Sequence, residues 1–225
     1  MEKHQKKLGI FAIYALLYLL VHVLLAKGLG RSLGIARMPL VTIQLVSYVI
    51  LGIWGIWLFR EDFKTGFALW EKRFWKSLLW LVGGLVADYV LMTLFSMPLY
   101  LLNPEYELIN ENNVASLIGV VPGVLLLVIC GILGPITEET IYRLIPVVGL
   151  RDKLPAAVAI ALPGLLFGMV HMHAFTIWEF MAALPHVATG LVYGFVLHKS
   201  RNATIPVILH VLNNFPAILV MLLQH

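Results

Sequence analysis

Seven apolar runs divide the chain, and they constrain its fold more than any other feature of the sequence. A helix needs about 20 apolar residues to cross a bilayer core of ~30 Å, and most of the runs reach that length. Their bounds are roughly Leu8 to Ala26, Pro39 to Phe59, Ser77 to Leu102, Val114 to Leu133, Ala156 to His171, Trp178 to Leu197 and Thr204 to Leu223. The sequence therefore predicts an all-α fold, a polytopic transmembrane helical bundle of about seven spans.

The composition excludes a soluble globular protein. Charged residues make up 12% of the chain and hydrophobic residues 60%, whereas soluble domains are about 25% charged. The net charge of +4 comes from basic residues in short loops, so it gives no signal for nucleic acid. The single cysteine, Cys130, excludes an intrachain disulfide and a cysteine-rich metal site. Because no repeat or linker is visible, we expect one integral membrane domain over residues 1–225, with a motif-bearing core at about 114–223.

The distribution of basic residues predicts the orientation in the membrane. If the amino terminus is inside, the inner segments hold 13 of the 16 lysine and arginine residues, and the outer segments hold Lys27, Arg31 and Arg37. Short loops rich in lysine and arginine stay on the cytoplasmic side. We therefore expect a multi-pass protein of the cell membrane with a cytoplasmic amino terminus and an outer carboxyl terminus. The first run is longer than that of a signal peptide and no Ala-x-Ala site follows it, which predicts an uncleaved anchor.

Two further patterns bear on how the helices lie and pack. Aromatic residues recur at spacings of three and four within residues 63–74, with basic residues off that stripe. This pattern is typical of an amphipathic helix in the inner interface, which would be an eighth helix, and equally of a solvated loop with aromatic anchors. Gly164 with Gly168, and Gly190 with Gly194, are pairs of small residues four apart that allow helices to approach closely.

A charged cluster interrupts the apolar background at residues 134–143, which read Gly-Pro-Ile-Thr-Glu-Glu-Thr-Ile-Tyr-Arg. A charged side chain at the centre of a membrane helix costs about 2.5 to 3.5 kcal/mol, so such groups should be paired, face an aqueous cavity or be catalytic. In a helix, Glu139 and Arg143 share one face and can form an ion pair, whereas Glu138 points about 100° away. Glu138 is then available for chemistry. Arg143 would hold this helix in place, unless it snorkels to the inner surface, and Pro135 predicts a local break or kink.

Two later runs each carry a pair of residues four apart on one helix face, Phe167 with His171 and His210 with Asn214. A lone histidine in an apolar helix is more often a hydrogen-bonded core residue than a catalyst. Three polar helix faces are a stronger signal, because unsatisfied polar groups in lipid are costly and one shared buried cavity satisfies them all. We therefore expect the three faces to converge.

The converging set would be chemically complete for hydrolysis of an amide. Glu138 and His171 are the expected pair that holds and deprotonates a water. His210 and the Asn214 amide are the expected donors to the developing oxyanion, where losing one donor costs other enzymes about 2.7 to 4 kcal/mol. Asp88 is predicted to hydrogen-bond a neighbouring helix or to line the cavity.

Four more histidines are predicted to be core or interface residues: His22, His173, His186 and His198.

In this order and on separate runs, the motifs Glu138-Glu139-x-x-x-Arg143, Phe167-x-x-x-His171 and His210-x-x-x-Asn214 resemble those of the CAAX protease and bacteriocin-processing family, which includes the Ras-converting CAAX endopeptidase. The resemblance covers about residues 134–214. It implies an all-helical intramembrane glutamic protease that needs no metal or other cofactor. The implied roles are a water activated by the first glutamate with the first histidine, and an oxyanion site from the second histidine and the asparagine. The implied partners are the lipid bilayer and a peptide or protein substrate, prenylated in some members; the oligomeric state is left open.

Three other functions fit parts of the pattern. A zinc hydrolase would use two histidines and a glutamate, but no His-Glu-x-x-His occurs and an arginine lies beside the carboxylates. A proton-coupled transporter would use the same buried groups but usually has repeated halves. A non-catalytic membrane scaffold, or a bacteriocin-immunity or regulatory protein, would use the same fold to bind a partner. The sequence favours the protease.

Overall fold

The computed structural model describes residues 2–29 and 32–224, and no strand occurs in these ranges. Arg31, one of the outer basic residues, lies outside the described part, as does the side chain of Lys27. Segments labelled η are π-helical. The helices are α1 (Glu2–Tyr18), η1 (Leu19–Leu29), α3 (Arg37–Leu58), α4 (Arg60–Lys72), α5 (Phe74–Leu102), α6 (Ile109–Ala115), α7 (Gly123–Val128), η2 (Ile129–Leu133), α8 (Gly134–Glu139), η3 (Thr140–Gly149), α9 (Ala156–Val170), α10 (Ile177–Ser200) and α11 (Thr204–Leu223).

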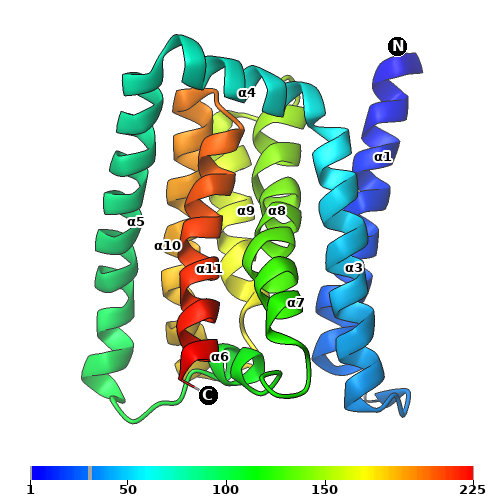
Figure 1. Ribbon diagram of the computed structural model, residues 1–225, viewed down its shortest axis with the longest axis vertical. Coiled ribbons are helices and arrows are strands. Elements are labelled where there is room, and N and C mark those ends of the chain that lie inside the picture. The colour runs from blue at the N-terminus through cyan, green and yellow to red at the C-terminus, as the bar shows by residue number, and fades with distance from the viewer. Residues whose placement is uncertain (1, 30–31, 225) are drawn as a thin grey trace.

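In the described part of the chain, six helical stretches are long and apolar enough to cross a membrane. They are Lys7–Leu25, Arg37–Leu58, Phe74–Leu102, Gly123–Gly149, Ile177–Ser200 and Thr204–Leu223. The fifth predicted run forms the shorter apolar helix α9, which has 15 residues and is therefore about 22 Å long at 1.5 Å per residue. The protein is thus a multi-pass membrane protein, and the predicted all-α polytopic bundle is confirmed (Figure 1).

The span that carries the acidic pair starts later than the predicted run from Val114 to Leu133. It continues through the charged cluster to Gly149, close to the extension toward Leu150 that convergence of the polar faces requires. Residues 109–115 form the separate helix α6, and the chain then turns through Gly119, whose φ of 81° lies in the left-handed region that glycine adopts at little cost. The span begins after Pro122 and continues through α7, η2, α8 and η3. The helical span continues through Pro135 without a break, and Pro135 lies in the first turn of α8, where a missing N–H is tolerated.

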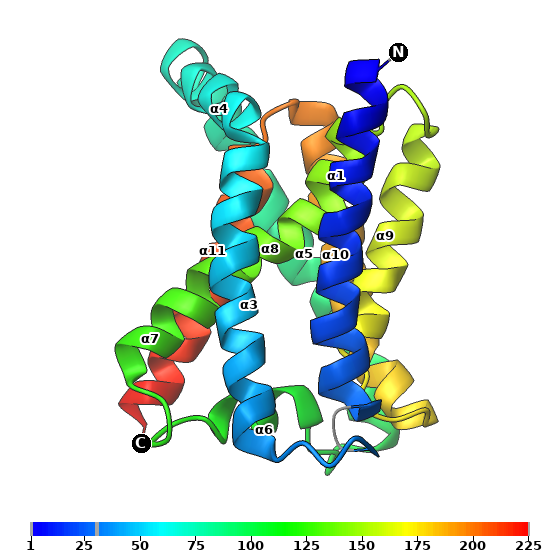
Figure 2. The ribbon, with the colours of Figure 1, turned by 90° about the vertical axis from the view of Figure 1, so that its right-hand side faces the viewer.

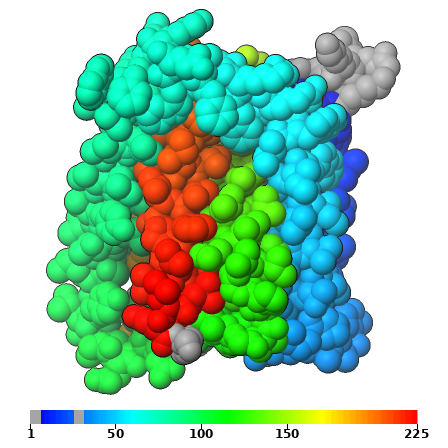
Figure 3. Space-filling view, in the orientation of Figure 1, coloured from blue at the N-terminus to red at the C-terminus, as the bar shows by residue number. Residues whose placement is uncertain are grey.

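The described chain starts and ends at opposite ends of the bundle, as the sequence predicts (Figure 1). The segment between α3 and α5 is helical, and this helix, α4, lies across the end where α1 starts (Figures 1 and 3). The loops after η3 and after α10 lie at the same end (Figure 2), so most of the basic segments share it. Arg143 is an exception, because it is buried inside a span rather than in an inner loop. Which end faces the cytoplasm stays a prediction.

Hydrogen bonds attach α4 to the start of α11. The Trp70 indole N–H donates to the Thr204 hydroxyl at 2.9 Å, and the Asn202 amide donates to the Gly66 carbonyl at 3.1 Å. Both Asn202 and Thr204 are buried. The interfacial helix is therefore fixed to the bundle by specific polar contacts as well as by its aromatic residues.

The predicted small-residue pairs meet each other. A Cβ atom added at Gly190 of α10 would lie 2.7 Å from the Gly164 Cα of α9, a distance that real Cβ contacts do not reach. The two helix backbones are therefore in direct contact, as expected for small residues at a membrane helix interface. This contact holds α9, which carries Phe167 and leads to His171, against α10.

Candidate active site

Both glutamates of the acidic pair lie in α8, inside the bundle. The Glu138 side chain is 10% exposed and that of Glu139 is 0% exposed. The Tyr48 hydroxyl of α3 donates a hydrogen bond to Glu138 Oε1 at 3.0 Å. Burying a carboxylate without partners is very costly, so each carboxylate should have an identifiable partner.

Arg143 is the charged partner of Glu139, as the spacing predicts. One terminal guanidinium nitrogen of Arg143 lies 3.0 Å from Glu139 Oε1, and both side chains are fully buried. The guanidinium carbon also lies 4.1 Å from the centre of the Phe167 ring and 5.6 Å from that of Tyr193. Aromatic faces attract a cation most strongly when it is desolvated. Arg143 is therefore held by one carboxylate and by aromatic rings within the membrane, and does not reach the inner surface.

His210 lies between the two carboxylates. Its Nδ1 is 2.8 Å from Glu139 Oε1, and its Nε2 is 3.5 Å from Glu138 Oε2. Because Glu139 pairs with Arg143 and is acceptor-only when ionised, Nδ1 is assigned as the donor toward it. Nε2 then faces the second carboxylate at a separation longer than a normal hydrogen bond. This separation suits a bridging water.

His171 joins this cluster through the ring of Phe167. The Phe167 ring centre lies 4.8 Å from that of His171 and 5.6 Å from that of His210, so both imidazoles contact one phenyl ring. His171 Nδ1 is 2.7 Å from the Phe167 carbonyl oxygen, which assigns Nδ1 as the donor and Nε2 as the acceptor. His210 lies close to Glu138, and the expected pairing of His171 with Glu138 stays a prediction.

His186 stacks on His171, with ring centres 4.0 Å apart and an angle of 18° between the planes. It is therefore a partly buried neighbour of the site, although its sequence position predicts only a core or interface residue. His22 is buried, 2.7 Å from the Ser47 hydroxyl.

Asn214 is less engaged than its neighbour. It follows His210 by one helical turn on α11 and is partly buried, and among the described residues no hydrogen bond is found for its amide. The Asn213 amide instead donates to Asp88 Oδ2 at 2.9 Å and to the Tyr193 hydroxyl at 3.1 Å. Asn214 therefore lies one helical turn from His210, and its amide forms no hydrogen bond to another helix in the described part of the chain.

Asp88 forms the hydrogen bonds between helices that the sequence predicts. It is fully buried and accepts from the Thr189 hydroxyl at 2.7 Å and from the Tyr193 hydroxyl at 2.8 Å. The Tyr193 ring in turn lies 5.8 Å from that of His210. The network joins α5, α10 and α11 directly behind the histidine.

Sequence reasoning missed two contributors to this site. Tyr48 comes from the second span, in which no motif is recognisable, and Tyr193 is one of several tyrosines in apolar helices. The only signal for Tyr193 was the intramembrane acid Asp88, which needs donors from neighbouring helices. The buried Glu138 also needs a hydrogen-bond donor, but nothing in the sequence indicates that this donor is Tyr48.

Comparisons with known proteins point to one family. The family model described as "Type II CAAX prenyl endopeptidase Rce1-like" matches residues 120–216, a range that includes all seven predicted site residues. A protein of Bacillus subtilis strain 168 named "Putative membrane peptidase YdiL" is 26% identical over 139 residues, which are 61% of this chain and 54% of that relative. The chain thus spans about half the length of this relative. No solved structure matches the chain significantly.

The matched region is the one in which the three motifs converge on a buried pair of carboxylates. Over residues 120–216 the chain is therefore similar to the type II CAAX prenyl endopeptidase family.

Proposed function

We propose that this protein is an intramembrane glutamic endopeptidase that hydrolyses a peptide bond in a membrane-associated or prenylated peptide or protein, without a metal. One observation carries the proposal: Glu138 Oε2 lies 3.5 Å from His210 Nε2 inside the bundle, and a second, ion-paired carboxylate orients the same imidazole. A carboxylate beside an oriented imidazole is an arrangement for acid–base chemistry.

Glu138 is the proposed general base. It takes a proton from a water while the water oxygen attacks the carbonyl carbon of the scissile bond. His171 holds that water together with Glu138, since its Nδ1 is the donor to the Phe167 carbonyl and Nε2 is then the acceptor nitrogen. Protonated Glu138 next returns the proton to the departing amide nitrogen. The carbon–nitrogen bond breaks and leaves an amine and a carboxylic acid, so atoms and charges balance.

His210 and Asn214 are the proposed stabilisers of the oxyanion. With Nδ1 directed to Glu139, Nε2 is the nitrogen of His210 that would donate to the oxygen of the reacting carbon. A preorganised donor of this kind contributes about 2.7 to 4 kcal/mol in other enzymes. Arg143 and Glu139 do not react in this scheme; they fix the rotation of His210.

Reconstituted protein tests the proposal. Purified protein in liposomes would be given prenylated and unprenylated peptides of the same sequence, with a chelator present, and cleavage measured by mass spectrometry. We expect Glu138→Gln to lower the rate by about 100-fold or more, as for loss of a general base. Glu105→Gln, the same change at an exposed residue of the loop between α5 and α6, should leave the rate unchanged.

Three results would contradict the proposal. Full activity of Glu138→Gln would show that Glu138 is not the general base. Loss of cleavage in the chelator would favour the zinc hydrolase. No cleavage of any peptide, together with a cellular role that Glu138→Gln preserves, would favour a non-catalytic scaffold or an immunity or regulatory protein.

A further inference from the structure

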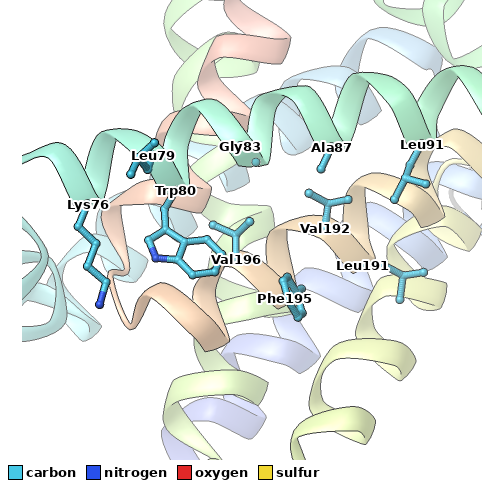
Figure 4. A pocket seen from close by; sticks show the side chains of 11 residues that line it. Lys76, Leu79, Trp80, Gly83, Ala87, Leu91, Leu191, Val192, Phe195 and Val196 are labelled. Carbon is cyan, nitrogen blue, oxygen red and sulfur yellow. The ribbon is translucent and has the colours of Figure 1, made fainter.

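An apolar groove lies between α5 and α10, on the side of these helices away from the polar cluster. It has a volume of about 670 Å³, within the range of about 300–1,000 Å³ typical of ligand sites. Figure 4 shows its walls, with α5 along one side and the side chains of α10 opposite. Residues from both helices line it: Lys76, Leu79, Trp80, Gly83, Gly84, Ala87 and Leu91 of α5, and Leu191, Val192, Phe195 and Val196 of α10.

The length of the groove suits a hydrocarbon chain. Its lining on α5 extends from Lys76 to Leu91, 15 residues further along the helix, which corresponds to about 22 Å at 1.5 Å per residue. The width comes from small residues in the middle: a Cβ atom added at Gly83 would meet no atom within 4 Å. Away from its basic end the lining is aliphatic and aromatic. The groove is therefore a channel along the helix axis rather than a round pocket.

One end of the groove is basic. Lys76 lies in the first turn of α5, beside α4, and its side chain stands at the end of the groove near Trp80 (Figure 4). Lys199 extends over the ring of Phe195, which lines the opposite wall, with 5.9 Å between its ammonium and the ring centre. Two cations thus flank the end of the groove that lies at the surface carrying α4. The other end is apolar and lies deeper in the span.

We propose that this groove binds an anionic phospholipid, with one acyl chain along α5 and the phosphate group beside Lys76 and Lys199. Two features together indicate this ligand. The channel is elongated and apolar, so it fits an extended hydrocarbon chain, and cations lie at its interfacial end. The acyl chain of a zwitterionic lipid would fit the channel equally well. Its headgroup would be attracted less, because each lysine near an anionic headgroup adds to the attraction. This inference depends on the membrane-spanning fold and not on the proposed hydrolase activity.

The groove also adjoins the polar network. Ala87 lines the groove and the next residue, Asp88, accepts the hydrogen bond of Tyr193 on the other face of α5; Val192 of α10 likewise lines the groove directly before Tyr193. A bound acyl chain therefore packs against the reverse side of the helix pair that lies behind His210. Lipid occupancy is expected to hold α5 and α10 at the spacing that this network requires.

Native mass spectrometry of the purified full chain tests the site. Protein in detergent would be offered an equal mixture of phosphatidylglycerol and phosphatidylcholine with the same acyl chains. We expect retention of phosphatidylglycerol by the wild type. Gly83→Leu fills the channel and should abolish retention, whereas Gly83→Ala leaves most of the space and should retain the lipid. Circular dichroism and the melting temperature of each variant show that the helix is intact.

A second pair of variants tests the charge. Lys76→Gln should lower the preference for phosphatidylglycerol over phosphatidylcholine about fivefold, the equilibrium equivalent of one lysine beside an anionic lipid. Lys153→Gln, the same change in the exposed loop before α9, should leave the preference unchanged. Equal retention of both lipids by the wild type, or unchanged retention by Gly83→Leu, would overturn the proposal. Displacement of the bound lipid by a farnesylated peptide would also overturn it, because the groove would then be a subsite for a prenyl chain.

Discussion

The buried ion pair between Glu139 and Arg143 should contribute much more to stability than an exposed ion pair of the same length. The chain contains the matched control, since Lys64 and Glu61 on α4 are also 3.0 Å apart but have side chains 71% and 67% exposed, against 0% for both members of the buried pair. The distance is the same and the burial differs most, although the exposed pair has lysine in place of arginine and Glu61 also lies 3.5 Å from Arg60.

The magnitude follows from what each single change leaves behind. Arg143→Met leaves the Glu139 carboxylate buried with only the His210 donor, and Glu139→Gln leaves a buried guanidinium without its counter-charge, while the glutamine carbonyl can still accept from His210. Removing one partner of a buried pair typically costs about 3 to 5 kcal/mol. The double variant leaves neither charge, so we expect a coupling energy of about 3 kcal/mol. An exposed pair typically gives about 0.2 to 1 kcal/mol.

The assay is reversible unfolding in mixed micelles, with the free energy of unfolding measured for the wild type, the two single variants and the double variant of each pair. The control cycle uses Glu61→Gln and Lys64→Met. A coupling energy below about 1 kcal/mol for the buried pair would refute the reasoning. It would mean that the aromatic rings around Arg143, at 4.1 Å for Phe167, hold the guanidinium without help from the carboxylate.

Three further predictions concern other parts of the bundle. Gly190→Ala should destabilise the protein by about 1 to 3 kcal/mol, because the new Cβ would lie 2.7 Å from a backbone atom of Gly164; an unchanged unfolding free energy would contradict the contact. Asp88→Asn should cost about 1 to 3 kcal/mol in the same assay, since one of its oxygens, each of which accepts a hydrogen bond, becomes a donor. Burial and the hydrogen bond to Glu179 raise the pKa of Tyr106 to about 12, above its unfolded value of about 10. The stabilisation from Tyr106 is therefore complete below pH 10 and is lost as the pH rises through 12, so the difference in melting temperature between wild type and Tyr106→Phe should shrink over that range; a constant difference would contradict the assignment.

The fold was predictable because apolar length alone selects membrane helices. The boundary of the fourth span was not, because residues 114–121 are mostly apolar and hide a turn that Gly119 and Pro122 produce. The fifth apolar run is visibly short in the sequence, so the short helix α9 was predictable. The close contact between Gly164 and Gly190 was not, because it depends on how the two helices lie relative to each other.

The candidate site was predictable within each helix and not between helices. Spacing places Glu139 and Arg143 on one face, and the ion pair is present. It says nothing of how α11 is rotated relative to α8, so the contact of His210 with both glutamates could not be predicted. For the same reason sequence reasoning did not predict the contact of His210 with Glu138, and its expected pairing of Glu138 with His171 stays a prediction. Whether these residues act as proposed stays a prediction until the variants are measured.

The helix α9 ends after 15 residues, and residues 171–176, which follow it, are not helical. About 22 Å of helix is less than the ~30 Å of hydrocarbon that a bilayer usually presents, and a short helix draws the two lipid surfaces together around it. Open backbone at that depth is tolerated only beside protein or water. The bilayer should therefore be thinner and more hydrated next to α9. A water molecule or a polar peptide would then cross less hydrocarbon to reach the carboxylates.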